Sequence, residues 1–225
     1  MTLAEYQALV GARKACRRCP ALINPAVACG GRFDSETLGP WTDWHGDLAA
    51  VVMVVGQDWG DVSYFEKTGG IDNPKNPTNV ALNALLTVIG FPIGTSRHAV
   101  ADSRVFLTNA ILCLKDGGLQ RPVKRKWFAN CGNAFLRPII DMVQPRVAVC
   151  LGEQSYRGVM SAFSFSVRGT FRQAVENPTG SLLTGGTRAF AVYHCGRLVQ
   201  NTHRPLALQR ADWQRIRPYV QDASP

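Results

Sequence analysis

The chain has 225 residues, and its 25 lysines and arginines against 16 aspartates and glutamates give a formal charge of +9 at pH 7. No apolar run approaches the roughly 18 residues that a membrane span needs, and the N-terminus lacks the basic-then-apolar layout of a signal peptide. We therefore expect one cytosolic domain, residues 1–225, with a polyanionic partner such as nucleic acid. In a reducing compartment, the seven cysteines indicate metal ligation and buried thiols rather than disulfides.

The N-terminal part combines a helix, a cysteine pair and a long loop. Residues 2–15 have apolar positions at helical spacing and two cations in the last turn, where the helix dipole favours positive charge. Cys16 and Cys19 follow, a spacing that lets two thiolates reach one metal centre from a single turn. Residues 20–47 are rich in Gly, Pro and Asp, which indicates a loop whose aromatic rings pack rather than bind.

A buried strand and the polar segment after it form the centre of the predicted fold. Residues 49–55 are an unbroken apolar run, which is typical of a strand covered on both faces of a parallel sheet. The run ends at the segment Gly56, Gln57, Asp58, Trp59 and Gly60. Open α/β sheets bind ligands at the carboxyl ends of their strands, so this segment is the first candidate for a site.

The rest of the chain alternates between predicted strands and helices. Further strands are expected at 105–112, 146–151 and 188–194, and helices at 78–90, 124–143, 152–163 and 206–220. Residues 61–77 are expected to be irregular and to cover the polar segment. The alternation predicts an α/β fold, a three-layer α/β/α sandwich with a mostly parallel four-stranded central sheet.

Two more cysteines complete a possible four-thiolate site. Cys113 follows the second strand and Cys131 lies on the next predicted helix, so a parallel sheet could bring both close to Cys16 and Cys19. Four thiolates hold either Zn²⁺ or an iron-sulfur cluster, and their number alone does not separate the two.

Four motifs in order resemble a known family. They are CxxCPAL at 16–22, GQDWG at 56–60, LTNAILC at 107–113 and THRPLAL at 202–208. The chain resembles the uracil-DNA glycosylase superfamily, in the branch that carries a [4Fe-4S] cluster, although GQDWG is closer to the cluster-free uracil glycosylases. The resemblance implies that Cys16, Cys19, Cys113 and Cys131 bind such a cluster.

The resemblance also implies a role for each candidate site residue. Asp58 corresponds to the carboxylate that activates water, His203 to the histidine that donates to uracil O2, and Asn109 to the amide that pairs with the base. The family's stacking ring is replaced by Gly70 and Ile71. Substrate contacts are therefore assigned to Gly56, Gln57, Trp59, Gly60 and Asn109, with Tyr64 or Phe65 as the stacking ring.

DNA contacts are implied for the last motif. Leu206 resembles the apolar wedge that fills the gap left by a flipped nucleotide, and Leu208 is its nearest competitor. Arg204 and Arg210 are expected to hold phosphates, as are the three cations at 124–126.

Together these features predict a uracil-DNA glycosylase of base excision repair that acts on uracil-containing DNA as a monomer. Three alternatives remain open at this point. The enzyme could remove another deaminated base, hypoxanthine or xanthine; the chain could bind lesions without cutting; or it could be a small zinc or electron-transfer protein. The last alternative leaves the polar segment at the strand end and the basic excess without an explanation.

Overall fold

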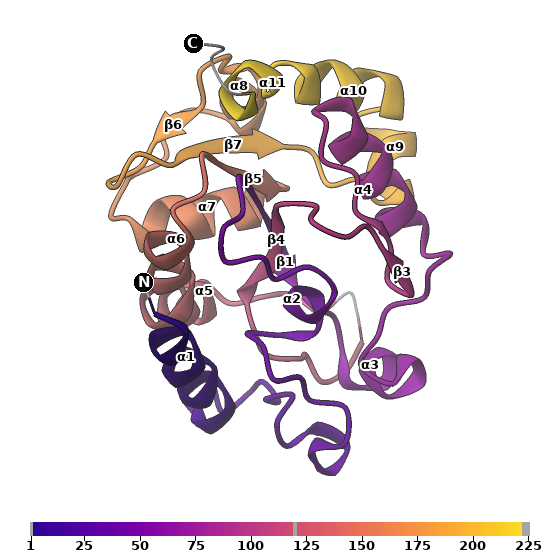
Figure 1. The fold of residues 1–225 in the computed structure, drawn as a ribbon, viewed down its shortest axis with the longest axis vertical. Coiled ribbons are helices and arrows are strands. Elements are labelled where there is room, and N and C mark those ends of the chain that lie inside the picture. The colour runs from indigo at the N-terminus through magenta and orange to yellow at the C-terminus, as the bar shows by residue number, and fades with distance from the viewer. Residues whose placement is uncertain (1, 119–120, 222–225) are drawn as a thin grey trace.

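The fold is built on a five-stranded sheet with the order β4–β1–β5–β7–β6 (Figure 1). The strands are β4 (Val105–Ile111), β1 (Val52–Asp58), β5 (Val147–Leu151), β7 (Arg188–Val192) and β6 (Ser181–Leu182). The first four run parallel, and β6 pairs antiparallel with β7. The structure is a computed structural model that describes residues 2–118 and 121–221. It confirms the mostly parallel α/β sheet but corrects the predicted count of four strands, because β6 is too short to leave an apolar pattern.

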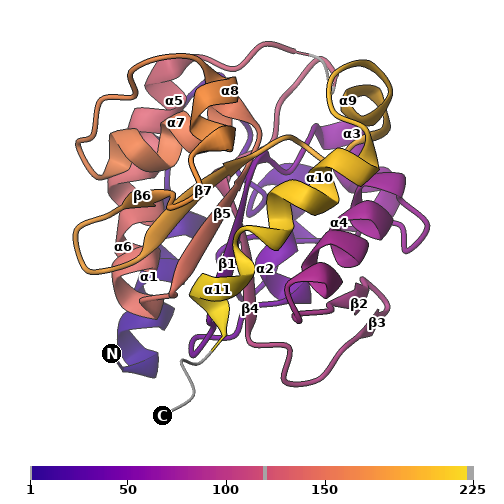
Figure 2. The same ribbon diagram turned by 90° about the horizontal axis from the view of Figure 1, so that it is seen from above.

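Helices cover both faces of this sheet because successive strand residues point to opposite sides. Met53 and Val55 belong to one core and Val52 and Val54 to the other. The first core lies under α1 (Leu3–Ala15), α5 (Arg125–Cys131), α6 (Arg137–Val143), α7 (Glu153–Ala162) and α8 (Phe171–Glu176). The second lies under α2 (Pro40–Trp44), α4 (Pro77–Val88), α10 (Leu206–Gln214) and α11 (Arg217–Val220). Figure 2 shows the resulting three layers.

Several local structures differ from the sequence prediction. The stretch at 61–77 is not wholly irregular, because Asp61 accepts a hydrogen bond from the Tyr64 amide (2.7 Å) and starts α3 (Val62–Thr68). The predicted helix at 124–143 is continuous, with a π-helical turn between α5 and α6. A further helix, α9 (Arg197–Thr202), follows β7. Within residues 2–118 and 121–221, no helix combines the length and the apolar character that a membrane crossing requires.

Candidate active site

The carboxyl ends of the four parallel strands border a cleft of about 610 Å³. Residues at or just beyond the end of each strand line it, namely Gly56, Asp58, Asn109, Leu151 and His194. In open α/β sheets the chain leaves the strands at this edge in loops that gather several side chains, and ligands bind there. This cleft is therefore the candidate active site.

Most of the predicted base-site residues line this one cleft: Gly56, Gln57, Asp58, Trp59, Gly60, Tyr64 and Asn109. The prediction for Phe65 is wrong. Its side chain is fully buried, and its ring packs edge-on against Phe33 at 6.1 Å between centroids. Neighbouring residues of a helix point in different directions, so α3 turns Tyr64 toward the cleft and the next side chain inward.

Gly56 brings the backbone of β1 close to two side chains of the cleft. It is the register partner of Asn109 on β4. A Cβ atom at Gly56 would lie 2.5 Å from Nδ2 of Asn109 and 2.8 Å from Cζ3 of Trp41. Trp41, one of the loop aromatics that were expected to pack, thus comes from α2 and forms a wall of the cleft. The absence of a side chain at position 56 is what lets both groups approach.

Both carboxylate oxygens of Asp58 contact a side chain, one through an ion pair and one through a hydrogen bond. Nζ of Lys115 lies 3.3 Å from Oδ1, and the side chains of both residues are 5% exposed. Nε2 of Gln57 donates to Oδ2 at 2.6 Å. Lys115 was not predicted as a site residue; it lies only two residues beyond Cys113, just after β4. The carboxylate is therefore oriented, paired with a cation and open to the cleft.

The histidine of the cleft is His194, and the prediction for His203 is wrong. His203 is exposed at the end of α9 and is not a lining residue, whereas His194 lies on the cleft wall two residues after β7. Burial lowers the pKa of His194 below its ordinary value, and attraction to Asp58 opposes this shift. The rule that sites lie at strand ends could have found this histidine, since the predicted strand 188–194 ends at it.

A buried carboxylate organises the loop that covers the cleft. Asp72 accepts hydrogen bonds from the Tyr64 hydroxyl, from Nδ2 of Asn76 (2.9 and 3.0 Å) and from Nδ2 of Asn79 (2.6 Å). Burial, and then the hydrogen bond and charge of Asp72, raise the pKa of Tyr64 to about 12. Tyr64 is therefore a fixed, neutral ring on the cleft wall, and its centroid lies 6.4 Å from that of Trp59.

The predicted DNA contacts lie in and before α10. Arg204 forms a bidentate ion pair with Asp212 (2.6 and 2.9 Å), so its guanidinium is already engaged within the protein. Leu206 is partly buried and packs on the second core, whereas Arg210 is exposed. Leu198 on α9, four residues after His194, is 70% exposed. Leu198 is thus a highly exposed apolar side chain that follows the cleft histidine closely in the sequence.

Comparison with known proteins shows which family the chain belongs to. The profile described as Uracil DNA glycosylase superfamily matches residues 44–218. The chain belongs to the uracil DNA glycosylase superfamily. It is also 29% identical over 199 residues to the Type-5 uracil-DNA glycosylase of Pyrobaculum aerophilum, which covers 84% of this chain and 81% of the relative. Membership supports a DNA glycosylase activity, and the matched residues include all cleft residues named above except Trp41.

In this superfamily member the four predicted cysteines line a second cavity, of about 200 Å³. Cys16 follows α1, Cys113 follows β4, Cys131 ends α5, and Cys19 closes the CxxC turn. Burial and then repulsion from the other thiolates raise the pKa of Cys113 to about 12.

The four cysteines are the kind of donor that either a zinc ion or an iron-sulfur cluster requires. Across the described ranges 2–118 and 121–221, no group of three or more His, Cys, Asp or Glu side chains could hold a metal ion as the side chains stand. The four thiols line a shared space of about 200 Å³. Their chemistry therefore fits the cluster that the resemblance implies.

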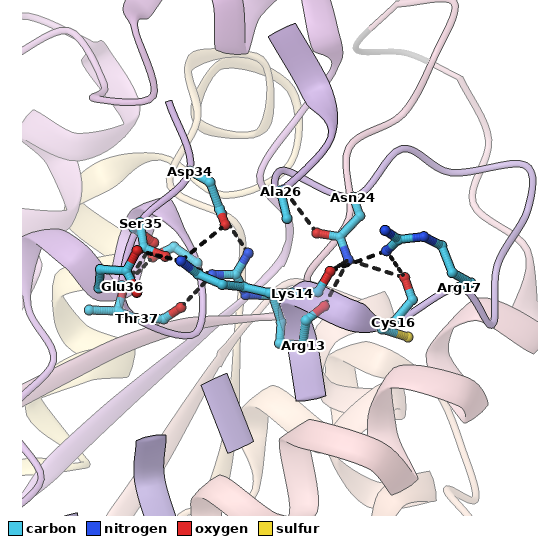
Figure 3. Close-up of polar contacts among 11 residues, drawn as sticks. Arg13, Lys14, Cys16, Arg17, Asn24, Ala26, Asp34, Ser35, Glu36 and Thr37 are labelled. Atoms are coloured by element: carbon cyan, nitrogen blue, oxygen red, sulfur yellow. Dashed lines mark hydrogen bonds and ion pairs between the residues drawn. The ribbon is translucent and has the colours of Figure 1, made fainter. Parts of the chain in front are cut away.

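A polar network fixes the loop that carries the CxxC turn (Figure 3). Nδ2 of Asn24 donates to the carbonyl oxygens of Arg13 (2.7 Å) and Cys16 (3.1 Å) at the end of α1. The buried Arg13 pairs with Asp34 and donates to the carbonyl oxygen of Thr37 at 2.7 Å. Nδ2 of Asn130, which lines the same cavity, donates to Sγ of Cys19 at 3.3 Å. The CxxC turn is therefore held by hydrogen bonds at both of its cysteines.

Proposed function

We propose that this protein hydrolyses the N-glycosidic bond of uracil in DNA and leaves an abasic site. The observation that carries the proposal is that Asp58 and Asn109, at the ends of neighbouring parallel strands, face one cleft. A carboxylate and an amide are the two groups that this reaction most needs, one for water and the sugar and one for the base. The superfamily match and the similarity to a Type-5 uracil-DNA glycosylase support the same activity.

Asn109 is proposed to select the base. An amide can accept from N3–H of uracil and donate to O4 at the same time, whereas cytosine presents the reverse pattern. The base of a duplex is out of reach, so the nucleotide must first rotate out of the stack, at a cost of about a few kcal/mol. Trp41, Trp59 and Tyr64 provide aromatic surface along the cleft for a flipped base.

Asp58 and His194 are proposed to carry the chemistry. As the glycosidic bond lengthens, positive charge grows on the sugar and negative charge on the base. The ionised Asp58 stabilises the sugar and orients the attacking water. His194 is the ring on the cleft wall and replaces His203 as the group that donates to the departing base. Because burial lowers the pKa of His194, it donates as a neutral imidazole.

DNA binding is proposed to use the exposed groups around α9 and α10. A wedge side chain must project into solvent before DNA arrives, and Leu198 satisfies this condition better than Leu206. Arg210 remains a proposed phosphate contact because it is exposed, whereas Arg204 is paired with Asp212. The formal charge of +9 adds a general attraction to the phosphate backbone.

Cys16, Cys19, Cys113 and Cys131 are proposed to bind a [4Fe-4S] cluster, which would supply a cross-link between distant parts of the chain. These residues join the end of α1 to the end of β4 and to α5. Hydrolysis of a glycosidic bond transfers no electrons, so the contribution of the four residues is to hold the fold together around the carboxyl end of β4, two residues beyond Asn109.

The test is excision from synthetic DNA that carries one modified base. The purified protein is incubated with duplexes containing uracil, hypoxanthine, xanthine or cytosine, and abasic sites are cleaved with alkali. We expect cleavage at uracil, and a loss of about 10² to 10⁴-fold in Asp58→Asn, because the amide cannot act as a base or counter-charge. Binding of the uracil duplex should survive this substitution. Cleavage at a purine in preference to uracil would contradict the proposal.

A further inference from the structure

Lys115 is a buried cation on the wall of the cleft. Its ammonium lies 3.3 Å from Oδ1 of Asp58, and the side chains of both residues are 5% exposed. The other oxygen of Asp58 accepts the hydrogen bond from Gln57 at 2.6 Å. One carboxylate oxygen is therefore ion-paired with Lys115, and the other accepts a hydrogen bond from Gln57.

Backbone hydrogen bonds keep Lys115 in register with the loop that carries Asp58. The amide of Lys115 donates to the carbonyl oxygen of Gly60 at 2.9 Å, and the amide of Val62 donates to the carbonyl oxygen of Lys115 at 3.0 Å. Asp61 and Lys115 form an isolated parallel bridge beyond the ends of β1 and β4. The backbone thus holds Lys115 beside the segment that carries Asp58.

Lys115 differs in charge from the other titratable side chains around Asp58. The other titratable side chains that line the cleft are Tyr64, Asp72, Glu153 and His194. Asp72 and Glu153 are the two carboxylates among them, burial raises the pKa of Tyr64 to about 12, and burial lowers the pKa of His194. Among the lining residues that the structure describes, Lys115 is the sole lysine or arginine.

We propose that Lys115 is a positioning residue that fixes the rotamer of Asp58 during base excision. The inference rests on the proposed function of Asp58. Lys115 acts through that carboxylate and is not itself a nucleophile or a contact of the base. An oriented carboxylate avoids reorganisation at the moment when positive charge develops on the sugar.

The first test is single-turnover excision from a uracil duplex over a range of protein concentrations. Lys115→Met should lower the maximal rate on the order of 10²-fold, because a shift of about 1 Å in a reacting site can cost that much. The protein concentration that gives half of the maximal rate should change little. Lys115→Arg should restore most of the rate, and Lys115→Gln, which lacks the charge, should stay low. Lys67→Met, at an exposed lysine of α3, is the matched control and should keep the parent rate.

The second test asks whether Lys115 acts through Asp58. In an Asp58→Asn background, Lys115→Met should lower the rate far less than it does in the parent, because coupled residues are not additive. Each variant is checked by circular dichroism and thermal unfolding. If Lys115→Met fails to fold, the Gln and Arg variants carry both tests.

Three outcomes would overturn the inference while uracil excision by the parent stands. These are a parental maximal rate in both Lys115→Met and Lys115→Gln, multiplicative losses in the double variant, and a borohydride-trapped adduct with abasic DNA that disappears in Lys115→Arg. The last would make Lys115 a nucleophile. If the parent itself releases no uracil, the proposed function fails, and that result is distinct from all three.

Discussion

Gly56 and Asn109 are register partners on neighbouring parallel strands, and the Asn109 amide occupies the space that a side chain at position 56 would need. A Cβ atom there would lie 2.5 Å from Nδ2, closer than van der Waals contact allows. The amide of Asn109 on β4, which is proposed to bind the base, can therefore take its position only because residue 56 on β1 is glycine.

Gly56→Ala should therefore displace Asn109, Trp41 or both. We expect single-turnover uracil excision to fall on the order of 10²-fold, because a shift of about 1 Å in a reacting site can cost that much. Gly11→Ala is the matched control, since nothing lies within 4 Å of its added methyl group and alanine favours the α1 helix. An undiminished excision rate in Gly56→Ala would show that the cleft tolerates movement of the amide.

Asn109→Asp should weaken uracil excision on the order of 10² to 10³-fold, the usual cost of losing one precisely aimed donor. The carboxylate supplies acceptors only and opposes uracil O4 with like charge. Asn83→Asp is a suitable control, because Asn83 uses its oxygen to accept from the amides of Ile93 and Gly94 and lies outside the cleft lining. A parental rate in Asn109→Asp would make Asn109 a core amide and the proposed base site wrongly placed.

Leu198→Ala should reduce excision from duplex DNA more than excision from a single strand, because only the duplex requires a wedge to hold the nucleotide out. The measurement is the ratio of the two single-turnover rates. Leu206→Ala and Leu208→Ala serve as comparisons. A duplex-specific loss confined to Leu206→Ala would return the wedge to the position first predicted from the motif.

Cys16→Ser and Cys113→Ser should each lose the broad visible absorption and the iron and sulfide expected of a [4Fe-4S] protein. Cys29→Ser should keep all three, since Cys29 does not line the cavity of the four cysteines. The readouts are absorbance spectra and iron and sulfide analysis of protein purified without oxygen. Colourless parent protein that holds one zinc per chain would contradict the cluster assignment.

The burial of His194 predicts that the free energy of unfolding falls in acid. Burial lowers its pKa in the folded state, so below about pH 6.5 the unfolded chain binds a proton that the folded chain does not. The stability that the uncharged His194 contributes is fully present above that pH. It is lost as the pH falls toward the folded-state pKa, at up to about 1.4 kcal/mol per pH unit. Chemical unfolding at pH 7.5 and 5.5 should show a smaller loss for His194→Asn than for the parent. Equal losses would mean that His194 titrates normally.

The amino-acid sequence by itself determined the elements whose signal is local. The apolar run before Gly56 and the one around Asn109 specify buried parallel strands, and parallel strands place their carboxyl ends at one edge. Position alone left Asn109 as either a core amide or a ligand contact, and the family resemblance paired it with Asp58. The CxxC spacing, with Cys113 after a strand and Cys131 on the next helix, made a four-thiolate site possible, the resemblance selected these four, and they line one cavity.

Only the tertiary structure decided which side chains complete the cleft, because their direction depends on packing between distant segments. The helical phase of α3 turns Tyr64 to the cleft and buries Phe65, and the start of α9 leaves His194 on the wall while carrying His203 away. Trp41 arrives from a loop helix that packs over Gly56. Lys115 reaches Asp58 because backbone pairing continues past the strand ends, and no local pattern in the sequence encodes that contact.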